Sequence, residues 1–246
     1  MSISLFKVGV VFIVLIGLLY LNNYYIANSI INSLFLLTIY FLCIASLWNF
    51  RLGRLKNGKL KINRVLFTYS LVIAICLYCL NYFFTYMHSL VFNGIDNIIL
   101  RGYEYVSLEQ IVFSILAYPL VEELLFRGSI LNILSKKVGN FKAVLLSSLL
   151  FAIAHIFSIS SVLLSFFSGI IFGYVYLKTH HVVYSYLVHL MYNGFVLYFN
   201  DKLNIFILNL NLNKQVIGLI ALLILSIVLL NFSLKKISLI EEKNIK

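Results

Sequence analysis

Long apolar blocks separated by short polar segments run along almost the whole chain. Crossing a bilayer takes about 20 apolar residues in a helix, and about eight blocks approach that length. The pattern therefore predicts an all-α fold, a polytopic membrane helix bundle of about eight transmembrane helices that forms one domain over residues 1–246. The expected spans are 4–21, 29–50, 65–92, 108–134, 142–158, 161–178, 182–199 and 215–234. The first block lacks a small-x-small cleavage site, so we expect a retained span rather than a signal peptide.

The composition agrees with a membrane protein, since 62% of the residues are hydrophobic and only 11% are charged. The net charge of +11 does not indicate a nucleic-acid partner, because the basic residues lie in short clusters between apolar blocks. With the N-terminus inside, 16 of the 19 Lys and Arg residues fall in cytoplasmic segments. We therefore expect an integral protein of a bacterial plasma membrane, in contact with lipid and with both termini cytoplasmic.

Four ionisable residues lie deep in apolar blocks, where each costs several kcal/mol unless it is paired or faces water. They are Glu122, Glu123, His155 and His189. Glu122, His155 and His189 are 14, 13 and 11 residues from the nearest cytoplasmic lysine. These separations correspond to roughly 21, 20 and 16 Å of helix. Three spans are thus expected to bring polar groups to one layer.

The adjacent glutamates cannot share one helix face equally, because successive residues are about 100° apart. Glu123 and Arg127 are four residues apart and can form an ion pair. Such a self-neutralised pair would account for both of these residues, but it leaves Glu122 unexplained. Glu122 is therefore expected to point into a cavity. A kink at Pro119 would widen and wet that cavity, or it would serve helix packing alone.

Two other pairs share a helix face by the same spacing, Phe151 with His155 and His189 with Asn193. The block between them carries a small residue at every fourth position, namely Ser165, Gly169 and Gly173. Such a strip lets a neighbouring helix approach closely, and we expect it to be structural.

The segments "EELLFR", "FAIAH" and "HLMYN" match in order the motifs EExxxR, FxxxH and HxxxN. In these motifs the chain resembles the CPBP family, the CAAX protease and bacteriocin-processing membrane proteins also called Abi, over about residues 108–199. The resemblance implies a helical membrane endopeptidase with a pocket open to the cytoplasm. It also implies peptide or lipidated protein substrates, in peptide (bacteriocin or pheromone) maturation or in self-immunity. By motif position the catalytic set would be Glu122, His155, His189 and Asn193, supported by Glu123, Arg127 and Phe151.

Hydrolysis without a serine or cysteine nucleophile needs an activated water. A carboxylate in an apolar pocket can act as general base, and Asn193 can donate to the developing oxyanion. The histidines can orient the water or bind Zn²⁺, with Glu122, His155 and His189 as the ligands. The short H-E-x-x-H arrangement is absent, so the motifs leave the need for a metal open.

Two other classes of function compete with an endopeptidase. A non-catalytic immunity factor or scaffold of the same fold would not need all four motif positions to be intact. A transporter with a proton-relay carboxylate would show similarly broken spans in two halves, and the sequence has no such repeat.

Overall fold

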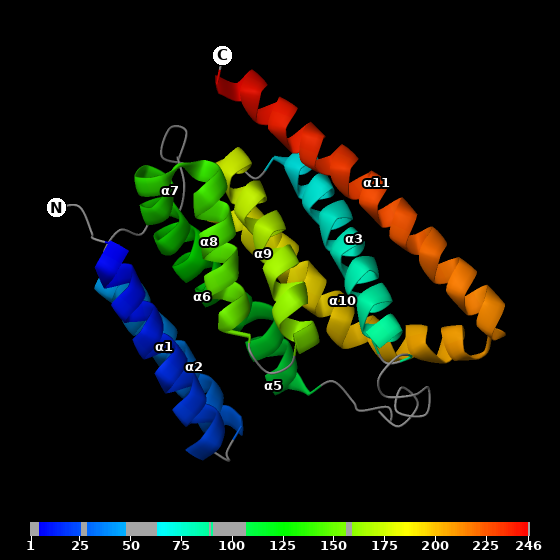
Figure 1. Cartoon of the computed structure of the whole chain (residues 1–246), viewed down its shortest axis with the longest axis horizontal. Coiled ribbons are helices and arrows are strands. Elements are labelled where there is room, and N and C mark those ends of the chain that lie inside the picture. Colours follow the sequence, from blue (N-terminus) through cyan, green and yellow to red (C-terminus); the bar gives the residue numbers. More distant parts are fainter. Residues whose placement is uncertain are drawn as a thin grey trace. The chain divides into compact units, whose positions relative to one another are not determined.

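The computed structural model describes residues 5–25, 29–47, 63–88, 90, 107–155 and 159–245, and these ranges contain helices and no strand (Figure 1). The expected polytopic all-α membrane fold is confirmed. The chain divides into two compact units, one of residues 1–61 and 112–186 and the other of 62–111 and 187–246. The prediction of a single domain is not tested by this division and stays a prediction.

Five helices are long and apolar enough to span a membrane, within the described residues. They are Ile30–Leu47, Arg64–His88, Ser161–Thr179, Val182–Asn200 and Leu212–Ile240. Two expected spans correspond to shorter apolar helices, Leu5–Tyr20 and Asn140–Ile153, so the count of eight is not confirmed. Residues 51–62, which hold most of one basic cluster, lie outside the described residues, as do 48–50, 91–92 and 156–158 at the ends of expected spans.

The first unit contains two helix pairs, α1 (Leu5–Tyr25) with α2 (Ser29–Leu47) and α8 (Asn140–Ile153) with α9 (Ile159–Thr179). The expected strip of small residues on α9 faces α8. A Cβ added at Gly169 would lie 3.1 Å from Ser148 Cβ, and one at Gly173 would lie 3.3 Å from Val144 Cγ1. The close helix contact predicted from the strip is therefore confirmed.

The expected span 108–134 is not one regular helix. It is a continuous helical path of α5 (Leu108–Gln110), the π-helical η3 (Ile111–Ala117), α6 (Tyr118–Glu123), the π-helical η4 (Leu124–Leu131) and α7 (Asn132–Val138). The distortion expected at Pro119 takes the form of a π segment that ends two residues before the proline. Local π turns can give new hydrogen-bond partners to the backbone carbonyls that a proline, which has no N–H, leaves without a donor. A side chain contributes as well, since the Tyr186 hydroxyl donates to the Leu116 carbonyl at 3.3 Å.

In the second unit, α3 (Arg64–His88) packs against α11 (Leu212–Ile245) and α10 (Val182–Leu208) through tyrosines. The Tyr82 hydroxyl donates to Asn204 Oδ1 at 2.8 Å, and the Tyr86 hydroxyl donates to Gln215 Oε1. These polar contacts lie in a core with Ile207 and Leu219. A hydrogen bond holds two helices together where lipid and core are equally apolar.

Candidate active site

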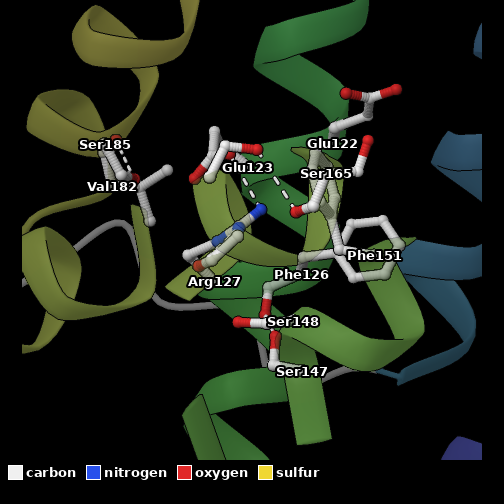
Figure 2. A network of polar contacts seen from close by, with 12 residues as sticks. Glu122, Glu123, Phe126, Arg127, Ser147, Ser148, Phe151, Ser165, Val182 and Ser185 are labelled. Carbon is white, nitrogen blue, oxygen red and sulfur yellow. Dashed lines mark hydrogen bonds and ion pairs between the residues drawn. The ribbon is translucent and has the colours of Figure 1, made fainter. Parts of the chain in front are cut away.

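The two glutamates of α6 point in different directions, as their adjacent positions predicted (Figure 2). Glu123 Oε1 lies 2.9 Å from Arg127 Nη1, and both side chains are 0% exposed. The predicted ion pair is therefore confirmed, and it lies in a part of the unit that water does not reach. Arg127 belongs to η4, and π turns of this kind often occur at functional sites.

The Arg127 guanidinium is held by more than its ion pair. Its Nη2 donates to the Gly169 carbonyl at 3.1 Å, which links η4 to α9. The Arg127 Cζ atom lies 4.6, 5.2 and 6.0 Å from the ring centroids of Phe151, Phe172 and Phe126. Aromatic faces attract a cation, most strongly when it is desolvated. The buried charge is thus compensated by a carboxylate, a carbonyl and three rings.

Glu122 has different surroundings, with polar partners from two other parts of the first unit. Its Oε1 accepts a hydrogen bond from the Tyr40 hydroxyl of α2 at 3.2 Å and lies 3.8 Å from His155 Nε2. The side chains of His155 and Glu122 are 26% and 11% exposed, whereas Glu123 and Arg127 are fully buried. Between the two glutamates, only Glu122 is open to water or to a substrate.

His155 is fixed just beyond the end of α8. Its Nδ1 lies 2.8 Å from the Phe151 carbonyl, and the two rings are 4.5 Å apart between centroids. A carbonyl oxygen only accepts, so we assign the proton to Nδ1. In the neutral ring the Nε2 lone pair then faces Glu122. The Ser161 hydroxyl donates to the His155 carbonyl at 2.8 Å and ties the same turn to α9.

His189 and Asn193 lie one turn apart in the continuous helix α10, so the expected shared face is confirmed. Both belong to the second unit, whereas Glu122 and His155 belong to the first. That all four residues converge therefore stays a prediction.

The Zn²⁺ site also stays a prediction. In the described part of the chain, no three His, Cys, Asp or Glu side chains gather closely enough to hold a metal ion. The described first unit does bring together two of the three expected ligands, Glu122 and His155.

Sequence reasoning missed three contributors, namely Tyr40, the Gly169 carbonyl and the ring of Phe172. Tyr40 is one of 17 tyrosines and lies 82 residues before Glu122 in a block without a motif, so no sequence signal marks it. Gly169 was noticed for its size, and the hydrogen bond of its carbonyl could not be inferred from that.

Comparison with known proteins finds similarity over the motif-bearing segment. Residues 105–195 match the family described as "Type II CAAX prenyl endopeptidase Rce1-like". The "Putative membrane peptidase YdiL" of Bacillus subtilis (strain 168) is 36% identical over 87 residues, which are 35% of this chain and 35% of that protein. The chain thus spans about a third of the length of this curated relative. No solved structure matches the chain. The CPBP-family resemblance is confirmed by the family match and this relative.

Proposed function

We propose that this chain, whose residues 105–195 match a CAAX prenyl endopeptidase family, is a membrane endopeptidase that hydrolyses a peptide or a lipidated protein. The observation that carries the proposal is the pairing of Glu122 with His155. A carboxylate oxygen of α6 and an imidazole nitrogen from the turn after α8 lie 3.8 Å apart, and both side chains are partly exposed. The neighbouring Glu123–Arg127 pair is closed to solvent and is suited to support rather than reaction.

The two atoms are well spaced to activate one water molecule. A water oxygen about 2.8 Å from each of two acceptors, a normal hydrogen-bond length, fits atoms that are this far apart. Since Nδ1 of His155 is the protonated nitrogen, Nε2 accepts from the water, as does Glu122 Oε1. Both water protons then point into the protein, and the oxygen lone pairs face outward toward a peptide carbonyl.

In this proposal hydrolysis proceeds in two steps, addition of water and cleavage of the peptide bond. In the first, the water oxygen bonds to the carbonyl carbon, its proton passes to Glu122, and the carbonyl electrons move onto the oxygen. In the second, the carbon–nitrogen bond breaks and Glu122 returns the proton to the departing amine. His189 and Asn193 are proposed to donate hydrogen bonds to the oxyanion, which is worth about two to three orders of magnitude in other proteases.

The chemistry of the donor set also fits a metal. A metal-bound histidine commonly donates its other ring N–H to a backbone carbonyl, as His155 does to Phe151. Glu122, His155 and His189 would hold Zn²⁺, which when bound would polarise the attacking water.

The decisive experiment compares the wild type with Glu122→Gln. Purified protein in phospholipid vesicles would be given internally quenched peptides with a prenylated C-terminus, the same peptides without the prenyl group, and longer apolar peptides. Peptidomics of host cells would run in parallel to find natural substrates, with bacteriocin- and pheromone-like precursors as the expected class. We expect Glu122→Gln to fold normally and to lose about 10²–10⁴ in rate, because general-base catalysis contributes that much.

A chelator control tests whether the cleavage depends on a metal. A chelator that abolishes cleavage, with recovery on adding Zn²⁺, would support the metal-dependent form, whereas full activity in chelator would support direct activation by Glu122. Cleavage by Glu122→Gln at the wild-type rate would show that Glu122 is not the general base. If the wild type cleaves none of these peptides, and Glu122→Gln fully rescues a strain from which the gene is deleted, the protease proposal is wrong. The non-catalytic immunity or scaffold role would then account for the family fold.

A further inference from the structure

Tyr40 lies outside the family segment, yet it contacts the carboxylate on which the proposed reaction depends. It belongs to α2, and the matched residues begin only at 105. Its hydroxyl donates to Glu122 Oε1 at 3.2 Å, and the tyrosine is 4% exposed. This contact therefore brings the motif-free N-terminal part of the first unit to the site.

The contact restrains the Glu122 side chain. A glutamate has three rotatable side-chain bonds, and Glu122 points away from Arg127, the cation that could have fixed it (Figure 2). The ring of Tyr40 is buried, so its hydroxyl is held in place by packing. Since this hydroxyl bonds the same oxygen that faces His155 Nε2, it orients the carboxylate toward the histidine.

The bond also has a direction. An ionised carboxylate is only an acceptor, and a tyrosine hydroxyl supplies one proton. Tyr40 therefore donates to Oε1, the carboxylate oxygen that also lies 3.8 Å from His155 Nε2. The hydrogen bond thus fixes the oxygen that faces His155 Nε2.

We propose that Tyr40 is a positioning residue for the reaction, holding the Glu122 carboxylate in line with His155. The inference rests on the proposed function and deepens it. In this proposal the α1–α2 helix pair supports the site, because α2 carries the Tyr40 hydroxyl and α1 packs against α2. A purely structural role for Tyr40 is the alternative, in which its hydroxyl only satisfies a buried acceptor.

The test uses Tyr40→Phe with a matched control, Tyr86→Phe. Each substitution removes one hydroxyl that donates to a side-chain oxygen, and Tyr86 is 2% exposed. Tyr86 bonds Gln215 between α3 and α11, and no motif residue takes part in that contact. The full-length proteins would be compared in vesicles on the peptide that the wild type cleaves fastest, by kcat, KM and thermal midpoint.

We expect kcat of Tyr40→Phe to fall about ten- to a hundredfold, as for other residues that orient a catalytic group. KM should stay within about twofold, since the hydroxyl does not bind substrate in this scheme. The thermal midpoint should fall no further than in Tyr86→Phe, which should keep the wild-type kcat. Wild-type kcat in folded Tyr40→Phe would overturn the inference, as would a loss of activity that only tracks a loss of folded protein.

The Glu122→Gln variant separates the two levels of the argument. If it cleaves like the wild type, Glu122 is not the general base, and the Tyr40 role is wrong with it; if the wild type itself cleaves no peptide, the proposed function is wrong. If Glu122→Gln is inactive while Tyr40→Phe has wild-type kcat, the endopeptidase proposal stands and the Tyr40 role alone is wrong.

Discussion

Replacing Glu123 with alanine would remove the carboxylate that lies 2.9 Å from the fully buried guanidinium of Arg127. The cation cannot reach water from that position, so it must stay charged among apolar groups or distort the helix. Breaking a buried ion pair by removing one partner costs roughly 3–5 kcal/mol. The other partners of Arg127 place the expected loss in that range rather than above it.

The partners that remain are the Gly169 carbonyl and three phenylalanine rings, of which Phe151 is nearest at 4.6 Å. Cation–π contacts contribute about 0.5–2 kcal/mol, so they offset only part of the loss. We therefore expect Glu123→Ala to lower the free energy of unfolding by about 3 kcal/mol. Against a total of about 5–15 kcal/mol for a typical protein, this is a large fraction, and folded yield should fall visibly.

The assay is unfolding in detergent micelles, followed by folded yield from membranes and by thermal midpoint. The matched control is the double variant Glu123→Leu/Arg127→Met, which removes both charges and keeps apolar volume. It should recover most of the lost stability, because replacing a whole buried pair is often neutral. Glu123→Ala protein that is as stable as wild type but completely inactive would refute the reasoning and assign the base to Glu123.

The close α8–α9 contact and the membrane orientation give two more predictions. Gly169→Ala should lower the free energy of unfolding by about 1–3 kcal/mol through overpacking, because the added Cβ would lie 3.2 Å from the Cα of Ser148. The control is Gly218→Ala, where a Cβ has open space, and it should not lower the thermal midpoint. Equal midpoints for the two variants would contradict this. In a chain whose native cysteines are replaced, an impermeant maleimide on intact cells should label Lys214→Cys but not Lys243→Cys, and labelling of the latter would overturn the predicted cytoplasmic C-terminus.

Contacts within one helix could be predicted from spacing, because residues four apart are neighbours on any helix surface. This is why the Glu123–Arg127 pair and the Phe151–His155 contact were expected and found. Contacts between distant segments left no such trace. The Tyr40–Glu122 bond joins residues 82 positions apart, and an apolar block with a tyrosine is typical of any membrane helix.

The irregular helix around the glutamates was also beyond the sequence pattern. Apolar residues fill the block 108–134 on all sides, so no periodicity separates α turns from π turns there. Pro119 indicated a distortion but not its type, and it gave no sign of the second π segment, Leu124–Leu131. The expected span became a path of five short helical segments, and the count of spans could not be derived from block lengths alone.

The two adjacent glutamates have opposite environments, since Glu123 is fully buried and Glu122 is partly exposed. Glu123 compensates Arg127 in a dry interior, and Arg127 in turn lies over the ring of Phe151. The carbonyl of Phe151 fixes the proton of His155 on Nδ1 and thereby aims the other nitrogen at Glu122. One step along the helix therefore separates a carboxylate that organises the site from a carboxylate that water can reach. Since Arg127 contacts the Phe151 ring and the Phe151 carbonyl contacts His155, we expect loss of the ion pair to disturb His155 before Glu122, which also contacts Tyr40 of α2.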